Sequence, residues 1–476
     1  MPFITRFSET LRLAALVLVT TPPLAPAQQS SPSGSTATLI AASPAVGTDT
    51  ALDSLVASAL TRNPTIRAAT TRAIGARHRV TAAAAPPDPM LMAGIQNQPL
   101  GKETSARGAS AMTAVGPDPM TMRMIGVSQT IPYPGKLALR RRIAEREAES
   151  ARITVEVARR LVTRDVKQAY YELAFIERAR EVVDRSRDVL TSVIHLTDAR
   201  YGLGASGPEE VIKSRIDGTR LAEMASDLAE QRRASLARLQ ALLHETLDTT
   251  ALRVEIPSRI ARLALPAAPD EIRFTSNVLG ARAAGSPLRP LSELQDLAVA
   301  NSVELREHEA MIGAQGLRVE LAHRERLPDV DVSLQYGQRG GGLPDMVSAA
   351  VSIPLPVFAR RRQDQLKRDA FAELEALHAE HEQAANALRA EVAALVSDIE
   401  RSRTQLALYA KALVPQGRAM LASAMSSYQV GKVELRDVLE AQAALLTYET
   451  EHVRALSDFA KQLAELERVV GTEVVR

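Results

Sequence analysis

The chain has 476 residues, of which 46% are hydrophobic but only 3% aromatic, and it contains neither Trp nor Cys. So few aromatic side chains argue against a thick globular core, while the abundant Ala, Leu and Val suit thin, closely packed helices. Lys and Arg number 58 against 56 Asp and Glu, and the net charge of +2 excludes the basic footprint of a nucleic-acid-binding protein. Without Cys we expect no disulfide, no thiolate chemistry and no lipid-anchored N-terminal Cys.

Residues 1–27 have the three parts of a secretory signal peptide. Arg6 and Arg12 form a basic region, an apolar run covers 13–19, and Ala25-Pro26-Ala27 supplies the small residues of a cleavage site. The run is too short to span a membrane, and no other stretch reaches the ~20 apolar residues that a spanning helix needs. We therefore expect an exported chain that could enter a membrane only as a β-barrel.

The mature chain contains an internal sequence duplication. Ile131-Pro132-Tyr133-Pro134 recurs 222 residues later as Ile353-Pro354-Leu355-Pro356, and the turn that begins at Tyr201 recurs 227 residues later at Tyr428. A repeat this long is a duplicated half-molecule rather than a solenoid of 20–50 residue units. The predicted organisation is a flexible segment at 28–50, a first repeat at 51–245, an irregular connecting region at 246–290 and a second repeat at 291–476.

The first repeat is expected to begin with a helix from Leu52 to about Ala85, where a run of prolines stops it. Strands at about 89–98 and 121–131 follow, then a helical hairpin at 136–243. Apolar and polar residues exchange faces within the second strand, near Met124, which predicts a bulge there.

The first helix of that hairpin has the seven-residue spacing of a coiled-coil seam. At about 1.5 Å per residue it would be roughly 100 Å long, far longer than an average globular helix. A turn containing Gly202, Gly204 and Gly207 then leads into the returning helix. The seam positions are Val155, Val162, Ala169, Ile176, Val183, Leu190 and Thr197.

The second repeat has the same order, with strands at about 328–337 and 345–353 and a helical hairpin at 358–470 that Pro415 is expected to kink. Its first strand alternates: Val332 and Leu334 share one face, and Asp331 and Ser333 share the other. Apolar-out and polar-in alternation is typical of a lipid-facing barrel strand. Four strands cannot close a barrel, whereas three copies with twelve strands can.

These features together resemble the TolC-type outer-membrane efflux proteins over essentially the whole mature chain. The resemblance rests on the order and duplication of three motifs: residues 59–64 (Ala-Leu-Thr-Arg-Asn-Pro), residues 127–132 (Val-Ser-Gln-Thr-Ile-Pro) with Gly135-Lys136, and the two turns. The Met residues of the strand region and Gly135-Lys136 resemble the heavy-metal-efflux branch more than the drug-efflux branch.

The resemblance implies a mainly α fold with a small β part in a homotrimer. Each protomer would give four strands to a twelve-stranded transmembrane β-barrel in outer-membrane lipid, and long antiparallel coiled-coil helices to a periplasmic α-barrel. The helices would dock a periplasmic adaptor (membrane fusion) protein and, through it, an inner-membrane pump. Such a protein is a passive duct for small solutes in a tripartite efflux or type I secretion system of a Gram-negative-type cell, with no cofactor and no catalysis.

The resemblance also assigns functional residues. Asp437 and Glu440 match acidic positions that ring the narrow inner end of the family's tunnel, and a carboxylate ring makes a pore cation-selective. Tyr428 and Glu210 match contacts that hold the tip closed, but Val433 stands where some members have an Arg in that lock. The residues that match the adaptor-docking tips are Gly202, Leu203, Gly204, Ala205, Val430, Gly431, Lys432 and Val433.

Plainer interpretations stay open for these residues. Asp437 and Glu440, three apart on one helix face, could be ordinary solvated charges, and Tyr428 lies on the seam spacing and so at least packs. His378 and His381 share a helix face and could bind a divalent ion, but the sequence offers no third ligand. A group of methionines could bind Cu(I) or simply fill irregular packing positions. That group is Met90, Met92, Met112, Met120, Met122 and Met124.

No motif for catalysis is present: the chain lacks a Gly-rich phosphate loop, G-x-S-x-G and H-E-x-x-H. The competing function is a non-channel coiled-coil structural or adaptor protein of the periplasm. That alternative accounts for the long helices but has no use for alternating strands.

Overall fold

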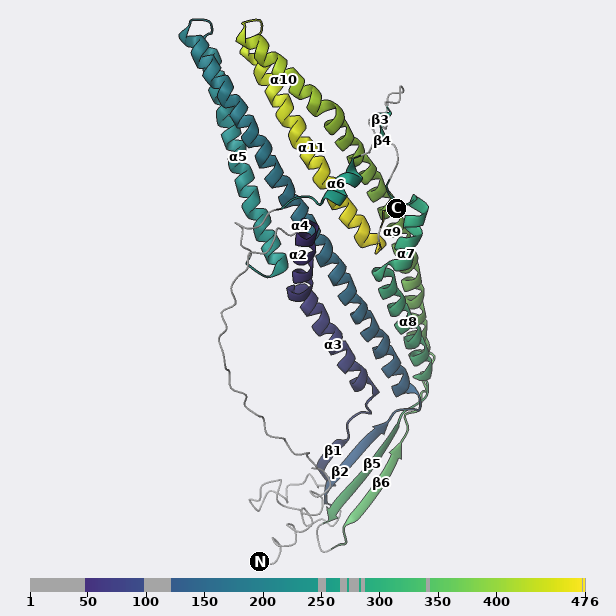
Figure 1. The fold of residues 1–476 in the computed structure, drawn as a ribbon. Coiled ribbons are helices and arrows are strands. Elements are labelled where there is room, and N and C mark those ends of the chain that lie inside the picture. Colours follow the sequence, from purple (N-terminus) through teal and green to yellow (C-terminus); the bar gives the residue numbers. More distant parts are fainter. Residues whose placement is uncertain are drawn as a thin grey trace, which may run out of the picture. The chain divides into compact units, whose positions relative to one another are not determined.

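The computed structural model describes residues 48–97, 121–246, 254–265, 272–273, 282–283, 287–339, 343–472 and 474–475, all within one compact unit, Gly47–Arg476. This unit is mainly helical, with one four-stranded antiparallel sheet. Figure 1 shows the sheet at one end of the long helices and the turns of the two helical hairpins at the other end. Among the described residues, no helix is both long and apolar enough to cross a membrane.

The elements confirm the predicted duplication. In each half, a helix leads to two strands and then to a hairpin of long helices. The first half contains α2 (Thr48–Arg62), α3 (Pro64–Ala84), β1 (Met90–Gln96), β2 (Met122–Ile131), α4 (Lys136–Gly202) and α5 (Pro208–Leu243). The second contains α7 (Leu291–Asn301), α8 (Val303–Arg324), β5 (Val330–Arg339), β6 (Met346–Ser352), α9 (Gln363–Leu408), the π-helix η3 (Tyr409–Leu413), α10 (Val414–Gln429) and α11 (Leu435–Val470). Between them lie α6 (Ser258–Ala264), β3 (Ile272–Arg273) and β4 (Arg282–Ala283).

The predicted single helix from Leu52 to Ala85 is wrong, because the structure divides it at Asn63. Asn63 has extended backbone angles, φ −61° and ψ 126°, and its side chain accepts a hydrogen bond of 2.8 Å from the Thr65 amide. A residue before proline avoids the helical region, whereas proline itself fits the first turn of a helix. Asn63-Pro64 therefore ends α2 and caps α3.

Pro415 disturbs its helix without ending it. The α-helical hydrogen bonding of α9 changes to π-helical over Tyr409–Leu413, and α10 continues at once from Val414. Proline cannot donate the bond that an α-helix needs from its amide, and one wide turn before it accommodates that loss.

The four strands pair in the order β1-β2-β5-β6, so the central pair joins the two repeats. Their register is continuous, from Met90 opposite Ser128 to Gln96 opposite Met122, and from Met122 opposite Arg339 to Ile131 opposite Val330. The predicted bulge near Met124 is therefore wrong. The large Met124 lies opposite Gly94 and Gly337, which leave room for it on the polar face.

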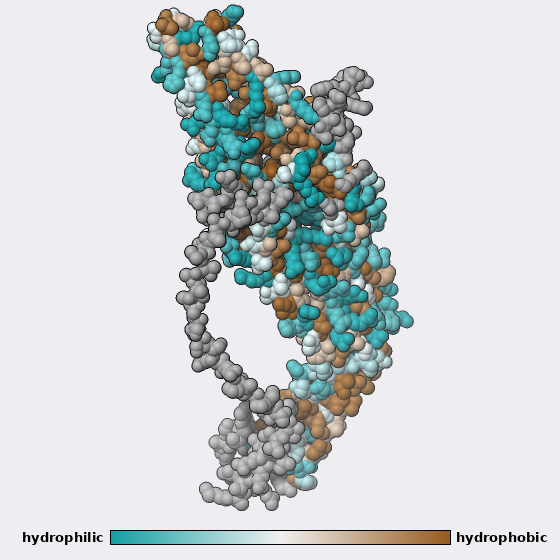
Figure 2. Space-filling model, viewed as in Figure 1, coloured by the Kyte–Doolittle hydropathy of each residue, from teal (hydrophilic) through white to brown (hydrophobic). Residues whose placement is uncertain are grey.

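The register gives the sheet two different faces. Leu334, for example, pairs with Val127 and Ala349 on an apolar face, whereas Ser333 pairs with Ser128 and Ala350 on the opposite face. Many apolar side chains are exposed, and Figure 2 shows apolar residues gathered over the strand region where grey atoms do not cover it. The exposed apolar residues of this face include Leu91, Ile95, Ile125, Val127, Val332, Leu334, Tyr336, Val347 and Val351.

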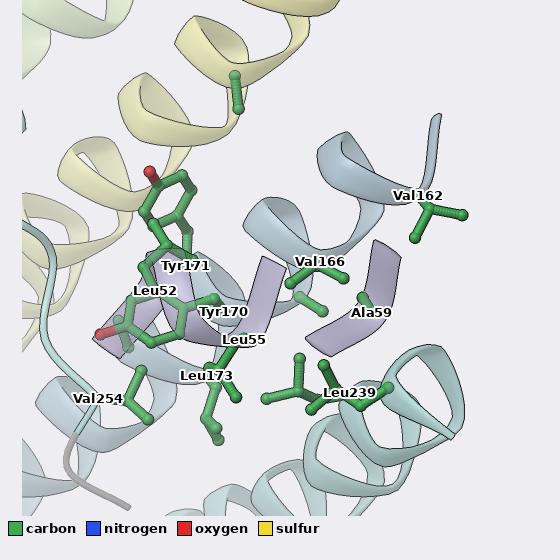
Figure 3. Packing of buried hydrophobic residues seen from close by; sticks show 14 of the residues in the cluster. Leu52, Leu55, Ala59, Val162, Val166, Tyr170, Tyr171, Leu173, Leu239 and Val254 are labelled. Carbon is green, nitrogen blue, oxygen red and sulfur yellow. The ribbon is translucent and has the colours of Figure 1, made fainter. Parts of the chain in front are cut away.

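The seam predicted on α4 is buried along its whole length. All seven positions, from Val155 to Thr197, are at most 9% exposed. Near the middle of α4 this seam meets α2 and α5, where Tyr170 and Tyr171 pack edge to face with ring centroids 5.9 Å apart (Figure 3). At the far end it enters a separate apolar cluster shared by both hairpins, which includes Leu190, Val193, Leu421, Leu435 and Val438.

Gly135 and Lys136 join the two repeats where strands meet helices. Lys136 is buried, and its Nζ donates to the Leu327 carbonyl at 2.6 Å and to Asp329 Oδ1 at 2.7 Å. Gly135 has φ +92°, and a Cβ there would lie 1.9 Å from a guanidinium nitrogen of Arg324. The flexible Arg324 side chain could move away from a Cβ, so the left-handed backbone is what favours glycine at 135, while the buried contacts of Nζ favour lysine at 136.

Candidate functional site

The two turns at the ends of the helical hairpins have the same backbone. In the first, the Gly204 amide donates to the Tyr201 carbonyl at 2.9 Å, and in the second the Gly431 amide donates to the Tyr428 carbonyl at 3.0 Å. Both glycines are left-handed, with φ +70° and +73°. A second bond, from the next residue's amide to the carbonyl five residues before it, is 2.9 Å in both turns. Each turn is a Schellman motif that ends its helix.

Tyr428 connects the two turns. Its side chain is completely buried, and its hydroxyl donates to Glu210 Oε2 at 3.0 Å. The Tyr428 hydroxyl oxygen also lies 3.2 Å from Thr197 Oγ1. The structure thus brings together Tyr428 and Glu210, two residues that the sequence analysis paired, and adds Thr197 from the end of the α4 seam.

Arg200 is a contact residue that the sequence analysis missed. Its guanidinium lies over the Tyr428 ring, with Cζ 4.5 Å from the ring centroid, and it donates to the Tyr428 carbonyl. It also donates to the Ala205 carbonyl at 3.2 Å. The Tyr428 carbonyl lies in the last turn of α10, where a positive charge is favourable, and the Ala205 carbonyl lies in the turn that follows α4. One cation therefore binds a carbonyl of each hairpin, and the sequence signal for it is that the matched position in the second turn holds Ser427 instead of a cation.

Burial raises the pKa of the Tyr428 hydroxyl above its ordinary value. The hydrogen bond to the Glu210 carboxylate raises this pKa further, while Thr197 and Arg200 act in the opposite direction. Tyr428 therefore remains protonated at physiological pH and can serve as a hydrogen-bond donor throughout.

Val433, where some family members have an arginine, instead packs partly buried against the apolar cluster at the tip.

Asp437 and Glu440 lie on one exposed stretch at the start of α11. Their side chains are 43% and 71% exposed, and Arg436 is the cation nearest to both, with N–O distances of 4.0 and 3.7 Å. Asp437 is in the first turn of the helix, where a carboxylate is favourable. In a single chain this geometry fits a carboxylate ring and a pair of solvated charges equally well.

The tips themselves expose apolar side chains. Leu203 is 84% exposed and Val430 is 67% exposed at the corresponding place in the second turn. A Cβ on Gly204 would meet no atom within 4 Å, so its positive φ, rather than crowding, is what requires glycine. Gly202, Ala205 and Lys432 are also exposed at the tips.

Among the described residues, the structure offers no third ligand for a metal at the histidines of α9. His381 faces His308 of α8, with ring centroids 6.3 Å apart. In the part of the chain that the structure describes, no group of three or more His, Cys, Asp or Glu side chains is arranged to hold a metal. Met90, Met92, Met122 and Met124 share the polar face of the sheet, and Met112 and Met120 lie outside the described residues.

Residues 55–244 and 294–472 match the outer membrane efflux protein family. The chain belongs to this family. Its fold is similar to that of the outer-membrane channel OprN, with a TM-score of 0.68 and 18% identity over 89% of this chain and 91% of that one. It is also similar to the outer-membrane protein VceC of Vibrio cholerae, with a TM-score of 0.65 and 18% identity over 89% of this chain and 97% of that one.

In sequence, the chain is 23% identical to the cobalt-zinc-cadmium resistance protein CzcC of Cupriavidus metallidurans, over 339 residues that cover 71% of this chain and 74% of that protein. The chain is thus an outer-membrane efflux protein, and its family is one of channels rather than enzymes. The competing interpretation as a coiled-coil scaffold finds no support, because it leaves the four-stranded sheet unused.

Proposed function

We propose that three copies of this efflux protein form one passive outer-membrane duct. The observation that carries the proposal is the sheet of the described strands, which has β1 and β6 at its edges and an exposed apolar face. Unpaired edges invite pairing with another chain. If β6 of each copy pairs with β1 of the next, twelve strands close into a barrel, with the apolar face toward lipid and the polar face toward the lumen.

The partners in this proposal are an adaptor protein and, through it, an inner-membrane pump, with the long helices in the periplasm. The exposed Leu203 and Val430 supply small apolar contacts at the two tips, which suit docking against the helices of an adaptor.

We take the cargo to be divalent metal cations, by analogy with the cobalt-zinc-cadmium resistance relative. The polar face of the sheet, which carries Asp331, Ser333 and Gln335, suits a hydrated cation.

We place the constriction at Asp437 and Glu440. Both carboxylates are exposed near the tip, and three copies would contribute six of them around one axis. Such a ring selects cations and binds divalent ions. In planar bilayers, divalent block from the side of the tips should therefore depend on these residues.

Gly431→Val is expected to abolish efflux while the trimer remains intact. Residues with a Cβ resist the left-handed backbone by roughly 1–2 kcal/mol, and β-branched valine resists it more, so the tip must rearrange. In cells that depend on this chain, cobalt, zinc and cadmium resistance should fall to the level of a strain without it. Gly316→Val is the matched control, because that glycine lies in α8 with open space around its Cβ position. Unchanged resistance with Gly431→Val would contradict the docking role of the tip.

A further inference from the structure

The two turns are copies of one another whose side chains differ in exposure. At an offset of 227 residues, Tyr201 corresponds to Tyr428 and Val193 corresponds to Met420. Tyr428 and Val193 are completely buried, whereas Tyr201 is 51% exposed and Met420 is 46% exposed. Equivalent backbones thus carry large side chains that are buried on one side of each hairpin and exposed on the other.

Within the chain, the buried residues form one joint. The first hairpin supplies a socket made by Thr197, Arg200 and Glu210, and the second supplies the Tyr428 ring that fills it. The same 227-residue offset places a second socket on the second hairpin, at Ala424, Ser427 and Asp437. It also places a second ring, Tyr201, on the first hairpin. Each chain therefore contains one complete joint, and it also carries an empty socket on the second hairpin and an unpaired Tyr201 ring on the first.

We infer that neighbouring copies complete the second joint, so that Tyr201 of one copy fills the socket of the next and donates its hydroxyl hydrogen to Asp437. This inference rests on the proposed trimer, in which a head-to-tail contact closes into a ring. The occupant of the socket is thus a second copy of this chain. The ring of helical hairpins then contains three joints within chains and three between chains, which alternate.

The joint between copies has fewer polar contacts than the joint within a chain. Ala424 replaces the Thr197 hydroxyl, and Ser427 replaces the Arg200 guanidinium. The cation–π contact and the binding of two carbonyls by one cation are therefore absent, and the Asp437 carboxylate remains as the only charged partner. The joints between copies separate first when the tip opens, and the joints within each chain keep the paired hairpins together.

The direct test replaces Tyr201 with the photo-cross-linking residue p-benzoylphenylalanine in the full chain in outer membranes. Irradiation should link two chains, with adducts mapped by mass spectrometry to the segment from Met420 to Asp437. The same substitution at Leu203, which is 84% exposed at the tip, is the control and should give no chain-to-chain adduct in that segment. An amine cross-linker applied to the same membranes reports independently whether trimers exist.

Absent trimers would overturn the proposed function and the joint together. Trimers with adducts from position 201 elsewhere, or with none, would overturn the joint alone. A second variant, Ser427→Arg, restores the missing cation and should lower the resting conductance of single channels severalfold. Unchanged conductance in Ser427→Arg would contradict the inferred place of Ser427 in the joint.

Discussion

Replacing Arg200 with alanine is expected to raise the resting conductance of the channel about thirtyfold. Arg200 donates to the Tyr428 and Ala205 carbonyls and covers the Tyr428 ring, so its loss removes the only charged donor at this contact and leaves the Tyr428 hydroxyl bonds and the apolar cluster between the two turns. A hydrogen bond to a charged group contributes about 1.5–3 kcal/mol, and about 2 kcal/mol changes a closed-to-open ratio about thirtyfold.

The measurement is the current through single channels in planar bilayers at low voltage. Arg200→Lys should recover only part of the closure, because an ammonium lacks the planar fork that reaches two carbonyls. Arg215→Ala is the control, since Arg215 is an exposed arginine near the same tip whose contact with Asp198 is 3.4 Å. If Arg200→Ala conducts no more at rest than Arg215→Ala, Arg200 does not hold the tip.

Lys136→Ala is expected to destabilise the protein by about 3 kcal/mol, the low end of the range for breaking a buried ion pair. The low end applies because the Asp329 side chain is 31% exposed and can regain some hydration, whereas that of Lys136 is 5% exposed. The Tyr133 amide also donates to Asp329 Oδ1 at 2.8 Å, so the carboxylate before β5 contacts both the segment that links β2 to α4 and the first residue of α4. Lys213→Ala, which changes an exposed lysine of α5, should be nearly neutral.

The same pair predicts a pH dependence. Burial would raise the pKa of Asp329, but the Lys136 ammonium and the Tyr133 amide outweigh burial and hold this pKa below its ordinary value of 3.8. A carboxyl whose folded pKa is lowered contributes stability above its unfolded pKa and loses it as the pH falls through the folded pKa. Thermal unfolding followed by helical circular dichroism should therefore show a loss of stability below about pH 4. Equal acid sensitivity of the wild type and Asp329→Asn would contradict this assignment.

Local patterns predicted much of this fold. The heptad series placed the α4 seam, and the glycines placed both turns, because each signal lies within a few residues of the structure it specifies. The break at Asn63 was visible in the Asn-Pro pair but was outweighed by the helical pattern on both sides. The prediction of a bulge was wrong because it used the sequence of β2 alone. The glycines that accommodate Met124 lie on the neighbouring strands β1 and β5.

The candidate site was only partly predictable. Tyr428 and Glu210 came from the family resemblance, and the structure brings them to 3.0 Å. Arg200 was missed because its partner lies 228 residues away and because the repeat suggests equivalence where the two turns in fact differ. Arg200 stands out only when the two repeats are aligned and the positions where their residues differ are considered, because Ser427 occupies the matching position.

The most direct test of the proposed duct is single-channel recording of the purified wild type beside the double variant Asp437→Ala and Glu440→Ala. The wild type should give discrete, cation-selective current steps that divalent cations block from the side of the helical tips, because six carboxylates would surround the narrowest point. The double variant should give larger steps with weaker cation selectivity and no such block. Discrete steps with unchanged block and selectivity in the variant would place the constriction elsewhere, and the absence of any steps from the wild type would contradict the duct itself.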